Sequence, residues 1–488
     1  MTTAAASRGA RGAAVTVSGQ FVKLLIQMIA LVALSRLLTP GDFGLIAMVM
    51  VFVGLGELIR DFGLPTAALQ AKTLSDAQAS NFFWANAALG ALSSVLLLAA
   101  TPIVVAIYDE PRLAGVMPAL AIAPLLNGLQ AQLQVRLARK LRFTAISATE
   151  VLAQSVGLGA AIWAAAAGAG YWALVVQSLA IAAVLLLSRA ALAQWVPGVP
   201  RRGVGSRVQL ASGGNLGMAM LLSYAATNAD SLVMGARFGA EVTGYYSRAF
   251  QLLSVPINGL LSPLTQVVVP IVNEMRKSGS RAVDTLLRVQ NVLGTLAVWV
   301  FAVAAASASD WIPLVLGAQW AGSISYFQIL AIGGSVQVFS FVSYWAFIVE
   351  EQSRELLRYN LLTKPLAIAL IVAGSFAGPA GVAWAYTLGL IVSWPINLVW
   401  LARTAGYPAL GFLMGGLRTL AAASAGYVAG VGLTHWLGLE NSWGSVAIVG
   451  GVVTVVYTAA IVVLPGGWRS LKSDVFMTIK MLRAGSAR

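Results

Sequence analysis

A positively charged side chain inside a strongly apolar stretch is the most chemically informative feature of this sequence. Lys23 lies in the apolar run from Val15 to Leu38, with Gln20 and Gln27 one helical turn to either side. Residues spaced three or four apart share one face of a helix. Because charges within apolar spans usually face a wet cavity, this face is a candidate site for phosphate or sugar oxygens. The alternative is that Lys23 reaches the membrane interface and serves only as an anchor.

A second polar group occurs near the middle of the chain, in the apolar run from Leu210 to Ala236. It comprises Asn215, Tyr224, Asn228 and Asp230, and Arg248 follows in the opening of the next run. We expect Asp230 and Arg248 at a similar depth, where they could form an ion pair. A buried pair of this kind can serve packing as well as function, and the sequence leaves both roles open. The polar residues of these two runs are the candidate substrate-binding residues.

Other polar residues are explained without function. Glu57, Arg60 and Asp61 stand at positions i, i+3 and i+4, where ion pairing within one helix accounts for them. His435 is interpreted as a packed or interfacial residue. The chain has no cysteine and one histidine, which excludes thiolate and His-rich metal centres. There is no glycine-rich phosphate loop, so we expect no ATP hydrolysis and no cofactor.

Composition places all these residues in a membrane protein. The 488 residues are 59% hydrophobic and 10% charged, with a mean hydropathy of +0.82, whereas soluble domains carry roughly 25% charged residues. Apolar runs of about 20 residues, enough to cross a bilayer, recur along the chain. These runs are too long and continuous for barrel strands, so we predict an all-α polytopic membrane protein. The net charge of +14 lies in short loops and does not indicate nucleic acid.

We predict about fourteen transmembrane helices, in two similar six-helix lobes followed by two extra C-terminal helices. The first lobe, residues 1–200, has runs at 15–38, 43–64, 81–108, 112–135, 145–167 and 171–187. The second lobe, residues 201–403, has runs at 210–236, 244–272, 289–307, 324–349, 356–376 and 381–401. The last part, residues 404–488, has runs at 412–437 and 445–464 and a basic tail. The first run is too long for a signal peptide, and we expect it to be retained.

Two similar turns suggest that the lobes are repeats. In the stretches Ser35–Leu45 and Ala236–Tyr246, aligning Leu38 with Phe238 also brings Gly44 opposite Gly244, at an offset of about 200 residues. Each turn carries one acid where a helix begins, a position that the helix dipole favours. Two unrelated turns would be the alternative. Because both halves enter from the same side, we predict a pseudo-twofold axis along the membrane normal, with helices one and seven flanking a central cavity.

Charge asymmetry predicts the orientation. Basic residues gather after even-numbered runs, as in 136–142 and 201–207, while loops after odd-numbered runs collect acids such as Asp109 and Glu440. The positive-inside rule therefore places both termini in the cytoplasm. In the tail 468–488, apolar residues recur at three- and four-residue steps among basic ones, as in a helix lying on anionic lipid. A frayed charged tail is the alternative.

Two stretches carry a resemblance to a known family. RGARGAAVTVSGQFVKLLIQMIALVALSRLLTPGDFGLIAMVMVFVGLGELIRDFGLPTAALQ and NADSLVMGARFGAEVTGYYSRAFQL resemble corresponding parts of bacterial oligosaccharide flippases. These belong to the multidrug/oligosaccharidyl-lipid/polysaccharide exporter superfamily. The resemblance implies alternating-access transfer of undecaprenyl-pyrophosphate-linked oligosaccharide to the periplasmic leaflet of the bacterial inner membrane, for surface polysaccharide synthesis. It also implies a lipid-linked oligosaccharide and membrane lipids as partners, and contact with polymerase or export machinery.

Other functions stay open at this point. A cation-coupled multidrug antiporter of the same superfamily would have twelve helices and a deep cluster of acids, which this sequence does not match. A membrane-embedded sugar polymerase or ligase would need a catalytic constellation, usually on a long outer loop, and every outer loop is short; we therefore expect no enzyme. A flippase of lipid-linked peptidoglycan precursors is a variant of the first function. The sequence leaves the sugar, the coupling ion and the oligomeric state open.

Overall fold

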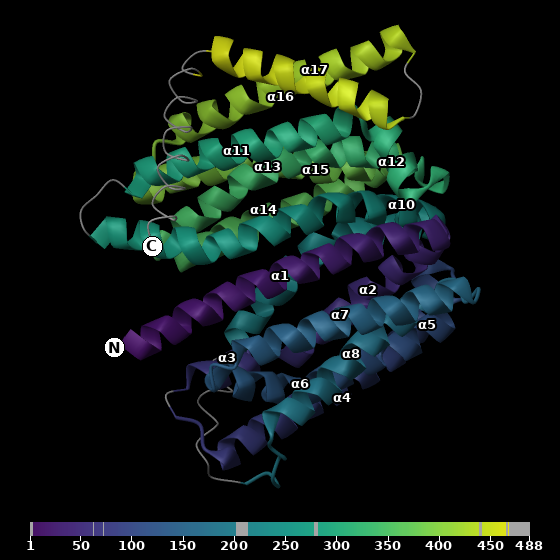
Figure 1. The fold of residues 1–488 in the computed structure, drawn as a ribbon, viewed down its shortest axis with the longest axis vertical. Helices are drawn as coiled ribbons and strands as arrows, with labels where there is room; N and C mark the ends of the chain where they lie inside the picture. Colours follow the sequence, from purple (N-terminus) through teal and green to yellow (C-terminus); the bar gives the residue numbers. More distant parts are fainter. Residues whose placement is uncertain are drawn as a thin grey trace. The chain divides into compact units, whose positions relative to one another are not determined.

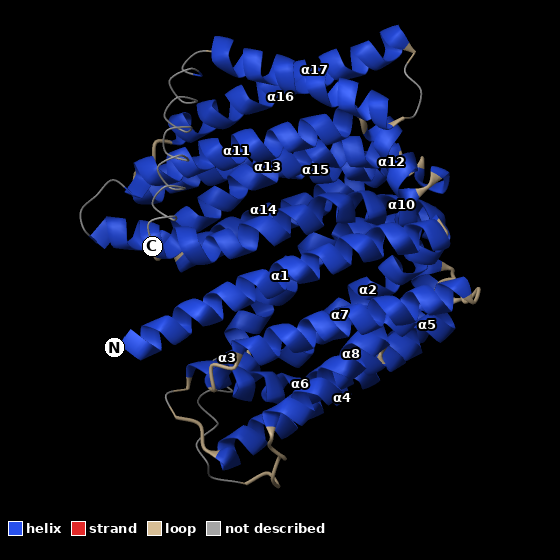
Figure 2. Ribbon diagram, in the orientation of Figure 1, coloured by secondary structure: helices blue, strands red, loops and turns tan. Residues whose placement is uncertain are grey.

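The computed structural model describes residues 3–61, 63–71, 73–201, 213–277, 282–438, 442–464 and 467. Every regular element in these ranges is a helix, and Figure 2 shows no strand among them. The all-α prediction is therefore confirmed. The basic tail 468–488, together with Arg202, Arg207 and Glu440, lies outside the described residues.

The chain divides into two compact units, residues 1–247 and 248–488. Figure 1 shows the long helices of each unit running side by side. The helices of the first unit are α1 (Thr3–Leu37), α2 (Pro40–Asp61), α3 (Leu64–Gln70), α4 (Asp76–Tyr108), α5 (Leu113–Leu120), α6 (Ile122–Arg139), α7 (Phe143–Ala166), α8 (Trp172–Ala193) and the first part of α10 (Gly213–Lys277). The expected three-part division at residues 200 and 403 remains a prediction.

The second unit contains the rest of α10 and the C-terminal helices. These are α11 (Ala282–Ala306), α12 (Ala308–Leu316), η1 (Ala318–Trp320), α13 (Ser323–Val349), α14 (Ser353–Gly374), η2 (Ser375–Ala377), α15 (Pro379–Ala405), α16 (Ala409–Leu437) and α17 (Trp443–Val463). Within this unit α17 packs on α16, α16 on α11, and α11 on α13 (Figure 1).

Within the described residues, eleven helices are long and apolar enough to cross a membrane, or twelve if a bent pair in α10 is one span. The protein is therefore a multi-pass membrane protein, but the expected number of fourteen spans is not confirmed. One reason is that the predicted seventh and eighth runs both lie in α10, whose two helices meet at a kink at Gly239 (φ 78°, ψ −178°) and are not counted as two separate spans. Another is that α16, although 29 residues long, is not among the helices that are apolar enough to cross a membrane.

A tight hairpin joins α7 to α8 in the first unit. Gly168 (φ 80°) and Gly170 (φ 55°) make the turn in a left-handed conformation that side chains with a Cβ atom adopt at a cost. Ala161 and Ala173, both fully buried, let the helices approach closely. Leu34 of α1 belongs to the same buried cluster. The polar residues of α1, α7 and α8 are thereby held on neighbouring helices.

The two repeated turns pack against each other within the first unit. Gly44 lies against the carbonyl of Ala240, and Gly244 lies against the carbonyl of Pro40, so neither glycine has room for a Cβ atom. The alignment of the turns pairs Gly44 with Gly244 and Pro40 with Ala240. The contacts are therefore reciprocal, as they are across a twofold axis. This geometry supports the interpretation of the two turns as copies of one motif.

Candidate functional site

Lys23 meets a carboxylate that we did not single out in the sequence. Its Nζ atom lies 3.5 Å from Oε2 of Glu150 on α7, and the two side chains are 26% and 29% exposed. Both are therefore sheltered by the protein but remain accessible from one side. A lysine that only anchored the helix at the membrane interface would have no need of this partner. Lys23 is thus ion-paired with a neighbouring helix of the first unit, and its role in binding remains a prediction.

Arg189 of α8 binds the other oxygen of the same carboxylate. Its Nη2 atom lies 3.2 Å from Oε1 of Glu150, and the side chain is only 2% exposed. Its Nη1 atom donates hydrogen bonds to the side-chain oxygens of Gln130 and Gln134 on α6, the second at 3.1 Å. One carboxylate is thus shared by two cations, and the five side chains together carry one net positive charge. We call Lys23, Gln130, Gln134, Glu150 and Arg189 the Glu150 cluster.

The positions of these residues along their helices explain why they meet. Glu150 lies two turns after α7 begins at Phe143, and Arg189 lies about one turn before α8 ends at Ala193. Since α7 and α8 form an antiparallel hairpin, these two positions are at the same end of the unit. At 1.5 Å per residue, both lie about 6–10 Å inside the helix ends. The predicted orientation makes this end the cytoplasmic one.

Gln20 and Gln27 remain candidate binding residues. Gln20 is exposed and Gln27 is partly exposed. In the described part of the chain, neither amide forms a hydrogen bond with another residue. Both amides are therefore free to bind an added ligand beside Lys23, and this role remains a prediction.

The polar residues near the middle of the chain have structural partners. The Tyr224 hydroxyl donates to the carbonyl of Val51 at 2.9 Å, and the Asn228 amide donates to the carbonyl of Tyr224 at 2.9 Å. Asp230, 1% exposed, accepts a 2.6 Å hydrogen bond from the hydroxyl of Tyr246. Asn215 lies in α10, but its side chain is outside the described residues. These contacts hold α10 in place, and a role in binding remains a prediction.

Arg248 opens the second unit and is 3% exposed. Its Nη1 atom donates to the side-chain oxygen of Gln251 at 2.8 Å, and its guanidinium lies 5.2 Å from the ring centre of Trp320. A cation over an aromatic face is stabilised electrostatically. The expected pairing with Asp230 would join the two units and stays a prediction.

The Glu57 group forms the local ion pairs that its spacing predicts. Arg60 lies 2.7 Å from Glu57 and 3.0 Å from Asp61, in both cases between nitrogen and carboxylate oxygen. The amide of Asn127 on α6 also donates to Glu57 at 2.7 Å. Both carboxylates and the guanidinium thus have partners. His435 is exposed near the end of α16.

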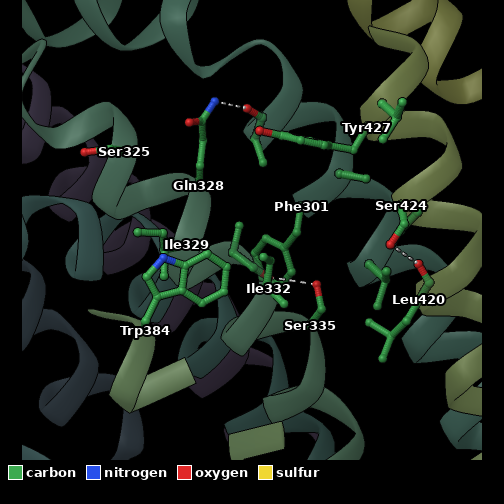
Figure 3. Close-up of a pocket in the computed structure, with 16 residues that line it drawn as sticks. Phe301, Ser325, Gln328, Ile329, Ile332, Ser335, Trp384, Leu420, Ser424 and Tyr427 are labelled. Carbon is green, nitrogen blue, oxygen red and sulfur yellow. Dashed lines mark hydrogen bonds between the residues drawn. The ribbon is translucent and has the colours of Figure 1, made fainter. Parts of the chain in front are cut away.

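A cavity of about 490 Å³ lies within the second unit (Figure 3). Residues of α11, α13, α15 and α16 line it, and most of them are apolar, such as Phe301, Ile332 and Trp384. Several of its polar side chains donate to neighbouring carbonyls, as Gln328 does to Ala305 and Ser424 to Leu420. This lining suits a hydrocarbon chain better than a sugar, because it leaves few groups free to bind hydroxyls.

Sequence reasoning missed four of the five members of the Glu150 cluster. Glu150 is an acid only a few residues inside the apolar run 145–167, and Arg189 lies two residues after the apolar run 171–187. Either charge could have been noted, as Lys23 was, from its place beside or within an apolar stretch. The choice of partners depends on how α1, α6, α7 and α8 pack.

Comparison with known proteins gives a family and a fold. The model of the family described as "Polysaccharide biosynthesis protein" matches residues 33–325. The chain is 22% identical to "Lipopolysaccharide biosynthesis protein WzxC" of Escherichia coli (strain K12), over 76% of this chain and 75% of that protein. It is 24% identical to "Teichuronic acid biosynthesis protein TuaB" of Bacillus subtilis (strain 168), over 64% and 65% of the two chains.

Among solved structures, the chain is similar in fold to a "Lipid II flippase MurJ, inward closed conformation". The TM-score is 0.72 at 12% identity, covering 93% of this chain and 99% of that one. A MATE-family multidrug transporter of the MOP superfamily in an inward-facing conformation gives a TM-score of 0.54 at 16% identity, over 84% and 99%. At these identities the likeness concerns the fold alone. Because the family model matches more than half of the chain, this protein belongs to the polysaccharide biosynthesis protein family of multi-pass membrane proteins.

Proposed function

We propose that this protein flips undecaprenyl-pyrophosphate-linked oligosaccharide from the cytoplasmic to the periplasmic leaflet of the bacterial inner membrane. The printed names of its relatives support this, since they concern lipopolysaccharide, teichuronic acid and succinoglycan, the last as a transport protein. The fold similarity to a lipid flippase and to multidrug transporters supports movement of a cargo by alternating access. The product serves surface polysaccharide synthesis.

The Glu150 cluster is the observation that carries the proposal. A sugar diphosphate is strongly anionic, and its entry into a low-dielectric span requires fixed cations. Lys23 and Arg189 supply two cations, while Glu150 neutralises one of them when no cargo is bound. A diphosphate can replace Glu150 as the ligand of Lys23, since lysine presents a mobile point charge. Gln20 and Gln27 would then donate to phosphate or sugar oxygens.

Arg189 plays a different part in this mechanism. It is nearly inaccessible and fixed by Gln130 and Gln134, so it holds Glu150 in position while Lys23 exchanges partners. The apolar cavity of the second unit offers a place for hydrocarbon rather than for the polar head group. Transport needs no catalytic residue and no cofactor. We further propose that both termini are cytoplasmic and that polymerase or export machinery takes up the flipped product.

Two alternatives rest on fold similarity. A flippase of lipid-linked peptidoglycan precursors agrees with the fold of the lipid II flippase, but the identity of 12% transfers no substrate. A multidrug antiporter agrees less well, since the TM-score falls to 0.54. Polysaccharide relatives cover up to three quarters of the chain, which favours the proposed cargo.

Deletion of the gene in its own host tests the proposal. We expect lipid-linked repeat units to accumulate on the cytoplasmic leaflet and surface polysaccharide to disappear, with both defects reversed by the wild-type gene. Lipid extraction followed by mass spectrometry, together with staining of surface polysaccharide, measures both. Accumulation of lipid-linked peptidoglycan precursor with normal surface polysaccharide would instead select the first alternative.

A further inference from the structure

The second unit contains a cation within a membrane span, Lys364, that has no partner among the described residues. Lys364 lies in α14, about 16 Å beyond the start of the helix at Ser353 at 1.5 Å per residue. Its side chain is partly buried. Throughout the described part of the chain, no residue forms a hydrogen bond or ion pair with it. A charge in this position costs free energy and usually marks a functional site.

Local acids do not account for Lys364. The nearest acid on its own helix is Glu355, and both oxygens of that carboxylate are occupied. Arg358 lies 2.6 Å from one oxygen, and the indole nitrogen of Trp400 donates to the other at 3.1 Å. Arg354 and Arg358 already supply the basic residues at the start of the helix. Lys364 lies more than one helical turn beyond Arg358, further from the start of the helix.

The internal repeat shows which part of the first unit corresponds to α14. Gly168 and Gly378 make the turns of the α7–α8 and α14–α15 hairpins, with φ values of 80° and 88°. Aligning these two glycines makes several buried positions of the two hairpins coincide. These pairs are Thr149 with Tyr359, Ala153 with Thr363, Ala161 with Ile371, Ala173 with Ala383 and Val175 with Ala385. Thus α14 corresponds to α7, the helix that carries Glu150.

The same alignment places Asn360 at the position of Glu150 and Lys364 at the position of Gln154, one turn further along. Residues four apart share a helix face, so Asn360 and Lys364 lie on the face that corresponds to the Glu150 face of α7. In the first unit this face holds a carboxylate between two cations. In α14 an amide replaces the carboxylate, and no described residue supplies a counter-charge to the cation.

We propose that Lys364, assisted by Asn360, is a second binding site for an oxyanion of the transported molecule. The proposal rests on the proposed function. The oxyanion is either the diphosphate of the lipid or the carboxylate of an acidic sugar, because a lysine with an adjacent amide binds both in the same way. The neutral Asn360 keeps the site cationic, whereas Glu150 reduces the charge of the first site. Each unit thus holds one cationic site for the anionic head group.

Binding to the full-length protein in nanodiscs tests this. The probes are undecaprenyl pyrophosphate, an undecaprenyl-pyrophosphate-linked disaccharide with one uronic acid, and uncharged undecaprenol. The change in tryptophan fluorescence of the protein measures the binding of each. We expect Lys364→Gln to weaken binding of a charged probe about tenfold, the effect of one lost charge-assisted hydrogen bond. Binding of undecaprenol should not change. Lys364→Arg should retain most of the affinity, and Lys364→Met should repeat the loss in a side chain of similar length.

The matched control is Lys277→Gln, since Lys277 is 67% exposed and pairs with Glu274 at 3.0 Å; it should bind like wild type. If Lys364→Gln loses affinity for both charged probes, Lys364 binds the diphosphate. If it loses affinity for the uronic acid probe alone, Lys364 binds the sugar carboxylate. Wild-type affinity in Lys364→Gln, with reduced affinity in Lys23→Gln, would overturn the Lys364 site and leave the proposed function standing. If wild type itself bound charged probes no better than undecaprenol, the proposed function would fail as well.

Discussion

At the scale of single residues, Lys23 carries the first prediction. Lys23→Ala removes the accessible cation of the Glu150 cluster and leaves Glu150 paired only with Arg189. We expect normal insertion, because a charge leaves an apolar span, but a loss of surface polysaccharide of about tenfold or more. Lys23→Arg should retain part of the activity, since the charge survives while the geometry changes. The amount of surface polysaccharide, measured at matched protein levels, tests this prediction. Full activity of Lys23→Ala would show that Lys23 is only an anchor.

The pair formed by Glu150 and Arg189 carries a stability prediction. Glu150→Gln removes the carboxylate that pairs with Arg189 and Lys23, and Arg189→Gln leaves Glu150 with the longer pair to Lys23 alone, so each should lower the melting temperature in detergent. The double variant should lose less than the sum of the two, with a coupling of about 1–3 kcal/mol. The exposed pair of Glu274 and Lys277 is the control, and its coupling should be about 0–1 kcal/mol. Equal couplings would show that the buried pair has no special role.

At the scale of elements, the reciprocal turns carry the third prediction. Gly44→Ala and Gly244→Ala each place a methyl group against a carbonyl of the opposite turn, at Ala240 or at Pro40. Backbone atoms cannot move aside easily, so both variants should lower thermal stability and transport. In Gly159→Ala the added methyl group meets no atom, and the better helix propensity of alanine should raise stability by about 0.5–1 kcal/mol. If all three variants behaved alike, the close contact of the two turns would not be needed.

The same elements show how far the sequence could predict the structure. The hairpin between α7 and α8 follows from its closely spaced glycines, and the helical class follows from long apolar runs. A turn between the seventh and eighth runs is also expected, and α10 kinks there at Gly239. The sequence does not show that the helix on each side reaches this kink, because a glycine between two apolar runs is equally compatible with a longer loop. Lys23 could be selected from its position in an apolar run, whereas its partner Glu150 lies 127 residues away and meets it only through packing.

At the scale of the whole molecule, charge asymmetry predicts the topology. Single cysteines can be introduced into this cysteine-free chain at Lys140, in a basic loop after α6, and at Arg112, in the acidic turn after α4. An impermeant thiol reagent applied to intact cells should label the cysteine at 112 and leave the cysteine at 140 unlabelled until the cells are opened. The opposite labelling pattern would reverse the orientation and move the Glu150 cluster to the periplasmic side.

The central claim is that the protein moves a lipid-linked oligosaccharide and that the Glu150 cluster binds its diphosphate. A flipping assay in proteoliposomes tests both parts directly. It uses fluorescent undecaprenyl-pyrophosphate-linked oligosaccharide and a quencher that reaches only the outer leaflet, so that the quenched fraction reports how fast the lipid changes leaflet. We predict rapid flipping with the wild type, at least tenfold slower flipping with Lys23→Ala, and wild-type rates with the surface variant Lys277→Gln. Equal rates for protein-free liposomes and wild type, or for wild type and Lys23→Ala, would contradict the account.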